Sequence, residues 1–142
     1  MAATNNTTTS GFVQVVADGV RLAYNQYGPP SAPNLVLIPG WAQTAAAFRK
    51  QVQHFQSRFR VTTYDHRGHG RVRQARLRVL VQLDLRDAAL LGHSMGGCGG
   101  PRIRYRGAKI RIFGKEEGGS HFMLWEIPEE FNRVVEEFLA SS

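Results

Sequence analysis

A serine flanked by glycines follows an apolar segment in the middle of the chain. Residues 92–96 read GHSMG and match the pattern G-x-S-x-G, and the apolar segment AALLG at residues 88–92 leads into it. In this pattern the glycines allow a sharp turn that lifts the serine hydroxyl above the end of a sheet. A hydroxyl is essentially neutral at pH 7 and becomes a nucleophile when a neighbouring base removes its proton. The segment therefore predicts Ser94 as a catalytic nucleophile.

Three further histidines could take part in catalysis or metal binding, but each has a simpler structural interpretation. His93 precedes the serine, and we interpret it as a side chain packed beside the strand rather than as a second base. His66 and His69 lie in the loop HRGHG and would suit a metal ion only with further ligands. That loop has no cysteine and no third ligand at a suitable spacing. Loop packing is the better interpretation, and no metal site is expected.

Patterns of apolar residues predict the elements that must position these side chains. The runs FVQVV and VRLAY on either side of Asp18-Gly19 predict a β-hairpin over residues 12–27. The unbroken apolar run in NLVLIPG at 34–40 is typical of a strand buried on both faces. Further elements are expected as strands at 59–65, 88–92 (buried) and 109–113, and as helices at 44–56, 71–83 and 128–139. This order predicts the α/β class, with a mostly parallel sheet and flanking helices.

The helix expected at 44–56 has a clear start and a clear apolar face. Thr44 is the predicted cap, because a threonine hydroxyl accepts a hydrogen bond from the free N–H groups of the first turn. Ala45, Phe48, Val52 and Phe55 recur at helical spacing. This face should pack on the sheet.

Length and composition are those of one folded domain. The chain has 142 residues, of which 42% are hydrophobic and 20% are charged. We predict a disordered tail at residues 1–11 and a single domain at 12–142. No apolar run approaches the ~18 residues of a membrane span, and the first residues lack the pattern of a signal or transit peptide. Cys98 is the single cysteine, so no internal disulfide can form. A cytoplasmic protein without a membrane span is expected.

Positive charge gathers in one part of the chain. The net charge is +7, and residues 67–115 contain twelve Lys or Arg residues against Asp84 and Asp87. Such a stripe is either a phosphate-binding footprint or a solvated face. No recognised nucleic-acid motif accompanies it, so nucleic-acid binding is not expected. If it occurred, the affinity would fall steeply with salt.

The motifs together resemble the α/β-hydrolase fold family, and in particular its lid-bearing branch of esterases and haloperoxidase-like enzymes. The resemblance rests on DGVRLAYNQYG, LVLIPGWAQ, TTYDHRGHG and LLGHSMGG in this order, and on the final segment GGSHFMLWEIPEEFNRVVEEFLA. It covers residues 12–70, 82–97 and 108–140. It implies an internally shortened version of that fold.

Carried over onto matching positions, the resemblance implies a site. Ser94 would be the nucleophile and His121 the general base, while the backbone N–H groups of Trp41 and Met95 would form the oxyanion hole. It implies no cofactor and no metal. The substrate would be a small molecule, an ester or a similar neutral compound.

The chain departs from the family where the triad's acid should lie. His121 follows Ser94 by only 27 residues, which leaves no room for the lid, the intervening strands and the loop that carries the acid. Asp65, Glu116 and Glu117 are weak replacements, so we assign no acid. A triad without its carboxylate loses ~10⁴ in turnover when the imidazole tautomer is no longer fixed.

A second departure concerns the helix that should follow the serine. Residues 96–101 read GGCGGP, and relative to alanine each glycine costs a helix ~1 kcal/mol and an interior proline ~3 kcal/mol. A long helix is not expected there, and the sheet should be incomplete, with an exposed apolar edge. Arginine-rich stretches at 71–78 and 99–107 lie where the resemblance breaks off. We interpret them as traces of an internal deletion or of a mis-joined reading frame.

Three functions are compatible with these features. The first is an active serine hydrolase, and the second is an inactive, truncated member that serves as a binding module or is a remnant. The third is an acidic-surface or nucleic-acid binder using residues 67–115. Trp41, Phe122 and Trp125 would line a substrate cleft in the first case, although aromatic side chains are more often part of a core.

Overall fold

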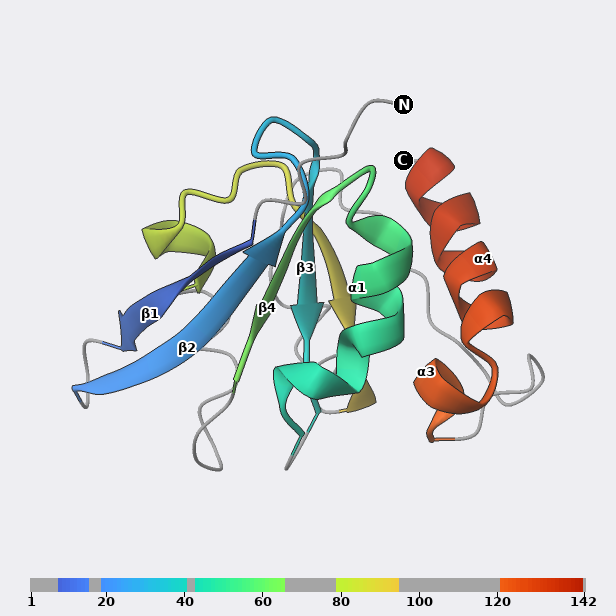
Figure 1. Cartoon of the computed structure of the whole chain (residues 1–142), viewed down its shortest axis with the longest axis horizontal. Coiled ribbons are helices and arrows are strands. Elements are labelled where there is room, and N and C mark those ends of the chain that lie inside the picture. Colours follow the sequence, from blue (N-terminus) through green and yellow to red (C-terminus); the bar gives the residue numbers. More distant parts are fainter. Residues whose placement is uncertain (1–7, 16–18, 41–42, 66–78, 95–120, 142) are drawn as a thin grey trace.

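The computed structural model describes residues 8–15, 19–40, 43–65, 79–94 and 121–141 (Figure 1). One sheet has the strand order β1-β2-β4-β3-β5. Its strands are β1 (Thr9–Val15), β2 (Val20–Tyr27), β3 (Asn34–Ile38), β4 (Arg60–Tyr64) and β5 (Ala89–Gly92). The helices are the 3₁₀-helix η1 (Ala45–Phe48), α1 (Arg49–Phe55), α3 (Met123–Glu126) and α4 (Pro128–Ala140). Residues 79–82 are also helical.

The sheet is mixed, with antiparallel pairing in one half and parallel pairing in the other. β1 and β2 form the predicted antiparallel hairpin, with Gly19 at φ +66° in the turn, and β2 pairs antiparallel with β4. β3 pairs parallel with both β4 and β5. The α/β class and the flanking helices are confirmed. The predicted tail was too long, because β1 begins at Thr9 and residues 9–11 pair with β2.

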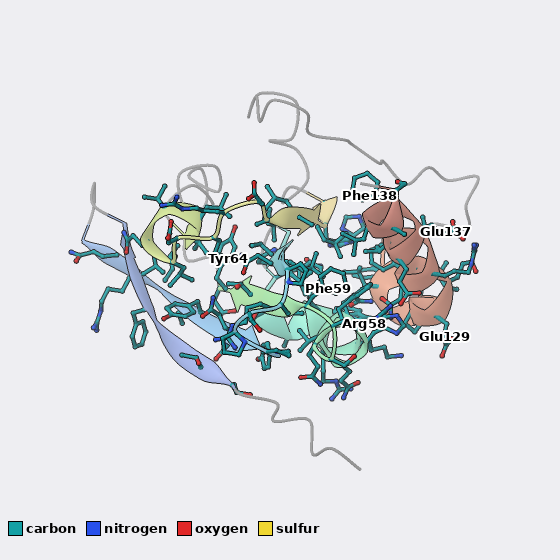
Figure 2. The ribbon with its side chains drawn as sticks, turned by 90° about the horizontal axis from the view of Figure 1, so that it is seen from above. Arg58, Phe59, Tyr64, Glu129, Glu137 and Phe138 are labelled. Atoms are coloured by element: carbon teal, nitrogen blue, oxygen red, sulfur yellow. The ribbon has the colours of Figure 1, made fainter. Side chains whose placement is uncertain are left out.

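β3 is buried on both faces, as its unbroken apolar run predicted. Leu35 and Leu37 pack with α1, α3 and α4, whereas Val36 and Ile38 pack on the opposite face with Val79 and Leu80. Successive side chains of a strand point to opposite faces, so one short apolar run joins both cores. Seen from above, α1 lies on one side of the sheet and the helical residues 79–82 on the other (Figure 2).

The segment predicted as one helix at 44–56 consists of η1 followed by α1. Phe48, Val52 and Phe55 are buried in the core, as the helical spacing predicted. Thr44 makes no side-chain capping bond, so that prediction was wrong. The Ala45 N–H donates instead to Asp65 Oδ1 (2.7 Å), at the end of β4. The tertiary fold therefore supplies the cap from another strand.

β5 differs from its prediction. It forms the edge of the described sheet, and its residues are partly buried or exposed rather than buried as expected. The open edge of the sheet stays a prediction, because residues 95–120 lie outside the described part of the chain. The segments predicted as a strand at 109–113 and as most of a helix at 71–83 lie outside the described residues.

The C-terminal helix packs on the outside of α1. α4 begins with Pro128 in its first turn, as expected, and buries Phe131 and Val135. Figure 2 shows Phe59 between α1 and α4, with Glu129 and Glu137 pointing away from the core. Gln51 is fully buried and donates to the Leu124 carbonyl (3.2 Å), which ties the short helix α3 to α1. Within the described ranges, no helix has the length and apolar character needed to cross a membrane.

Candidate active site

Three parallel strands end at one edge of the sheet, and the candidate site lies there. β3, β4 and β5 run in the same direction, so their carboxyl ends meet at that edge. Gly40, Asp65 and Ser94 follow these three strands. The His93 N–H donates to the Ile38 carbonyl (3.1 Å), which continues the pairing of β3 and β5 up to the residue before the serine.

Ser94 adopts a conformation that favours glycine. It is exposed and has φ +53°. In this left-handed region an L-residue costs about 1–2 kcal/mol, because Cβ comes close to the following carbonyl oxygen. A Cβ added to Gly40 would lie 3.0 Å from Ser94 Cβ and 3.1 Å from the His93 carbonyl oxygen. The serine therefore lies close to the end of β3, and a side chain at position 40 would require these neighbours to shift by a few tenths of an ångström.

His93 is packed beside the strand, as expected. Its side chain is buried, with Nε2 2.6 Å from the His121 carbonyl oxygen and Nδ1 2.9 Å from Gln43 Oε1. Burial lowers the pKa of His93 below its ordinary value of 6.5, although the hydrogen bond to the His121 carbonyl acts in the opposite direction. The ring is therefore predominantly neutral at pH 7.

His121 comes to the same edge from a distant part of the sequence. Its ring centroid lies 4.9 Å from that of His93 and 5.4 Å from that of Phe122, and its side chain is exposed. The neighbour of Ser94 in the chain is thus in direct contact with His121. The structure brings the segments of these two predicted site residues together.

Of the other predicted site residues, the structure describes Asp65. Asp65 uses a carboxylate oxygen to bind the Ala45 backbone, which is consistent with a structural role. The predicted oxyanion-hole donors, the other candidate acids and the loop histidines lie outside the described residues: Trp41, Met95, Glu116, Glu117, His66 and His69.

Two aromatic side chains lie beside His121 and are not part of the core. Phe122 and Trp125 are 47% and 44% exposed and stack with their ring centroids 5.6 Å apart. Trp125 Nε1 donates to the Ala47 carbonyl (2.7 Å), which fixes the ring against η1. A flat apolar surface is therefore available next to His121.

Gln43 is a site residue that the sequence analysis missed. Its Oε1 accepts a hydrogen bond from the Gly40 N–H (2.9 Å) and also faces His93. It lies 50 residues from His93 in the sequence, and no pattern in the sequence signals the pair. Among the residues that the structure describes, no cluster of three or more His, Cys, Asp or Glu side chains could hold a metal ion.

The chain belongs to the α/β-hydrolase fold family. The family model described as alpha/beta hydrolase fold matches residues 33–100, which run from β3 to beyond Ser94. The non-heme chloroperoxidase of Burkholderia pyrrocinia is 34% identical over 93 residues, covering 56% of this chain and 34% of that protein. The 3-oxoadipate enol-lactonase 2 of Acinetobacter baylyi is 30% identical over 133 residues, covering 85% of this chain and 42% of that protein.

A solved structure supports the same assignment. A hydrolase from Pseudomonas aeruginosa has a TM-score of 0.56 and 32% identity, over 63% of this chain and 38% of that chain. The chain therefore matches only about a third to two fifths of the length of these relatives. The family model covers β3, β4 and β5, the strands that end at the candidate site.

Proposed function

We propose that the protein is a serine hydrolase that acts on an ester or a similar small neutral molecule. Ser94 is the nucleophile and His121 the general base, and the backbone N–H groups of Trp41 and Met95 are assigned to the oxyanion hole. The proposed reaction needs no metal or cofactor. The relatives include hydrolases and haloperoxidases of the same superfamily, which supports the reaction class.

The proposed chemistry has two steps. Ser94 Oγ attacks the ester carbonyl carbon while His121 takes the hydroxyl proton, and the alcohol leaves with that proton as the acyl-enzyme forms. Water then attacks the acyl-enzyme and gives its proton to His121, which returns it to Ser94 as the acid is released. Donors placed near the carbonyl oxygen would stabilise the negative charge that develops in both steps.

One observation carries the proposal. The residue before Ser94 contacts His121, so the segments that carry the proposed nucleophile and the proposed base lie together at the carboxyl edge of the parallel strands. Backbone strain of this kind persists where the surrounding structure determines it, and it is typical of active sites. Exposure of Ser94 and His121 leaves both side chains accessible to a small substrate.

Covalent labelling tests the proposal directly. A fluorophosphonate probe should label the wild-type protein and not the Ser94→Ala variant, because the probe reacts only with an activated serine. Ester hydrolysis should be weak, and Ser94→Ala and His121→Ala should each abolish it. The double variant should be no slower than either single variant, since the two residues act as one unit. Hydrolysis that survives both single substitutions would contradict the assignment.

A second candidate is an inactive member that serves as a binding module. It is favoured by the short matched length and by the glycine-rich segment after Ser94, which is unsuited to a helix. For this candidate, labelling would be absent from a folded wild-type protein. The same probe experiment therefore separates the two functions.

A further inference from the structure

Gln43 and His93 connect three segments of the candidate site. Gly40 N–H donates to Gln43 Oε1 (2.9 Å), and the Gln43 N–H donates back to the Gly40 carbonyl (3.3 Å). The His93 ring lies between Gln43 Oε1 and the His121 carbonyl oxygen. The loop after β3, the end of β5 and the segment that leads into α3 are thus joined through one imidazole.

The chemistry of this chain of contacts fixes the proton on His93. Gln43 Oε1 is identified as an oxygen because the Gly40 N–H can only donate to it, and a backbone carbonyl such as that of His121 can only accept. Both ring nitrogens of His93 therefore face acceptors, whereas a neutral imidazole carries a single N–H. The shorter contact is from Nε2 to the His121 carbonyl (2.6 Å), so Nε2 carries the proton in the neutral ring.

We propose that His93 is a positioning residue that fixes the backbone of His121 beside Ser94. This inference rests on the proposed function. The hydrogen bond from Nε2 anchors the His121 carbonyl, and the His93 and Phe122 rings pack against the His121 ring. The contacts restrain the place from which the His121 imidazole acts. In the usual triad a carboxylate orients the histidine, and here a histidine buried beside the nucleophile restrains it instead.

The His93 ring also lies beside Gln43, which is hydrogen-bonded to the residue that precedes Trp41. Gln43 closes a short loop on Gly40, and the next residue in the chain, Trp41, is an assigned oxyanion donor. A Cβ added to Gly40 would lie 3.0 Å from Ser94 Cβ. A change at His93 should therefore affect the arrangement of the reacting groups more than the binding of a small substrate.

Two variants of His93 test the positioning role. His93→Leu removes both ring nitrogens, and His93→Gln retains a donor that can reach the His121 carbonyl. We expect His93→Leu to lower kcat for ester hydrolysis, and the labelling rate of Ser94, by about 10- to 100-fold, because a misplacement of 1 Å costs about 10²-fold. KM should change little, and His93→Gln should recover most of the loss. His54→Gln is the matched control, since His54 is exposed on α1 and pairs with Glu136.

A measurement on the wild-type protein keeps the proposal testable if the variants fold poorly. Long-range ¹H–¹⁵N NMR of the imidazole rings should show His93 protonated at Nε2, with a proton that exchanges slowly. A His93 ring protonated only at Nδ1 would overturn the proposal whether or not the chain is active. Unchanged kcat in a folded His93→Leu variant would also overturn it.

The proposed function fails in a different way. If the Ser94→Ala variant is labelled as strongly as the wild-type protein, Ser94 is not the nucleophile. A positioning role for His93 then fails as well. The NMR result still reports in that case whether the contact between His93 and His121 exists. The two failures are therefore distinguished by independent measurements.

Discussion

At the scale of single residues, the candidate site depends on close contacts rather than on unusual composition. Ser94 adopts a left-handed conformation at a cost of about 1–2 kcal/mol. Gly40 permits the close approach of β3, and the neutral ring of His93 fills the space between Gln43 and His121. Gly40 and His93 therefore have steric or hydrogen-bonding reasons for their identity, whereas Ser94 is held in a backbone conformation that costs free energy.

Burial of His93 makes the stability of the fold depend on pH. The pKa of His93 is lower in the folded protein than its ordinary value of 6.5, so the unfolded chain binds a proton more readily than the folded chain. The contribution of His93 to stability is complete above pH 6.5 and is lost as the pH falls below 6.5 and through the folded pKa. We expect the wild-type protein to lose more stability than His93→Gln between pH 8 and about pH 5. Urea unfolding at both pH values measures the difference, and equal losses would show that burial does not shift the pKa.

At the scale of elements, a carboxylate from β4 determines where η1 begins. Asp65 Oδ1 accepts from the first N–H of η1 across 20 residues of sequence, whereas the adjacent Thr44 makes no capping bond. The same hydrogen bond explains why Asp65 is a weak candidate for the missing acid, because one of its oxygens already has a backbone partner.

The capping arrangement gives a paired prediction. Asp65→Ala should destabilise the protein by about 1 kcal/mol, the usual cost of removing a cap. Thr44→Ala should have little effect, and Asp65→Asn should retain most of the stability because its amide oxygen still accepts. Chemical denaturation of the three variants checks the order. A larger loss for Thr44→Ala than for Asp65→Ala would contradict the structure.

The turn after β2 gives a second prediction at this scale. Gly28 has φ +85°, and an added Cβ would lie 2.3 Å from the backbone oxygens of both Gln56 and Phe59. Gly19 has φ +66° with open space around the same position. Gly19→Ala should therefore cost about 1–2 kcal/mol for the conformation alone. Gly28→Ala should cost clearly more, because backbone atoms must also move. Similar melting temperatures for the two variants would show that the loop at Gly28 rearranges freely.

At the scale of the whole molecule, the chain matches only part of the length of its relatives. The relatives are more than twice as long as the part they have in common with this chain, and β5 ends the described sheet with residues that are only partly buried. An edge strand with exposed backbone groups and apolar side chains promotes association between chains. We therefore expect weak hydrolytic activity and self-association of the chain.

The open edge predicts marginal stability and self-association. We expect the melting temperature to lie within or below the mesophilic range, and the apparent mass to rise with protein concentration. Size-exclusion chromatography with light scattering over a range of concentrations, together with calorimetry, measures both. A monodisperse monomer that melts cooperatively above ~65 °C would contradict this prediction.

The sequence alone determined those features that depend on local patterns. The alternating runs around Gly19 predicted the hairpin, and the unbroken apolar run of β3 predicted burial on both faces. Helical spacing predicted the burial of Phe48, Val52 and Phe55. GHSMG after an apolar segment predicts Ser94 as the nucleophile, and this assignment stays a prediction. Period and turn chemistry act over a few residues, so a sequence records them directly.

Only the tertiary structure decided the contacts between distant segments. Asp65 rather than Thr44 caps η1, and Gln43, His93 and His121 meet although 50 and 28 residues separate them in the chain. The partial exposure of β5 likewise depends on which strands pair with it. Hydrogen bonds of this kind form because strands that end at one edge bring their loops together, and no local pattern specifies which side chains then come within 3 Å.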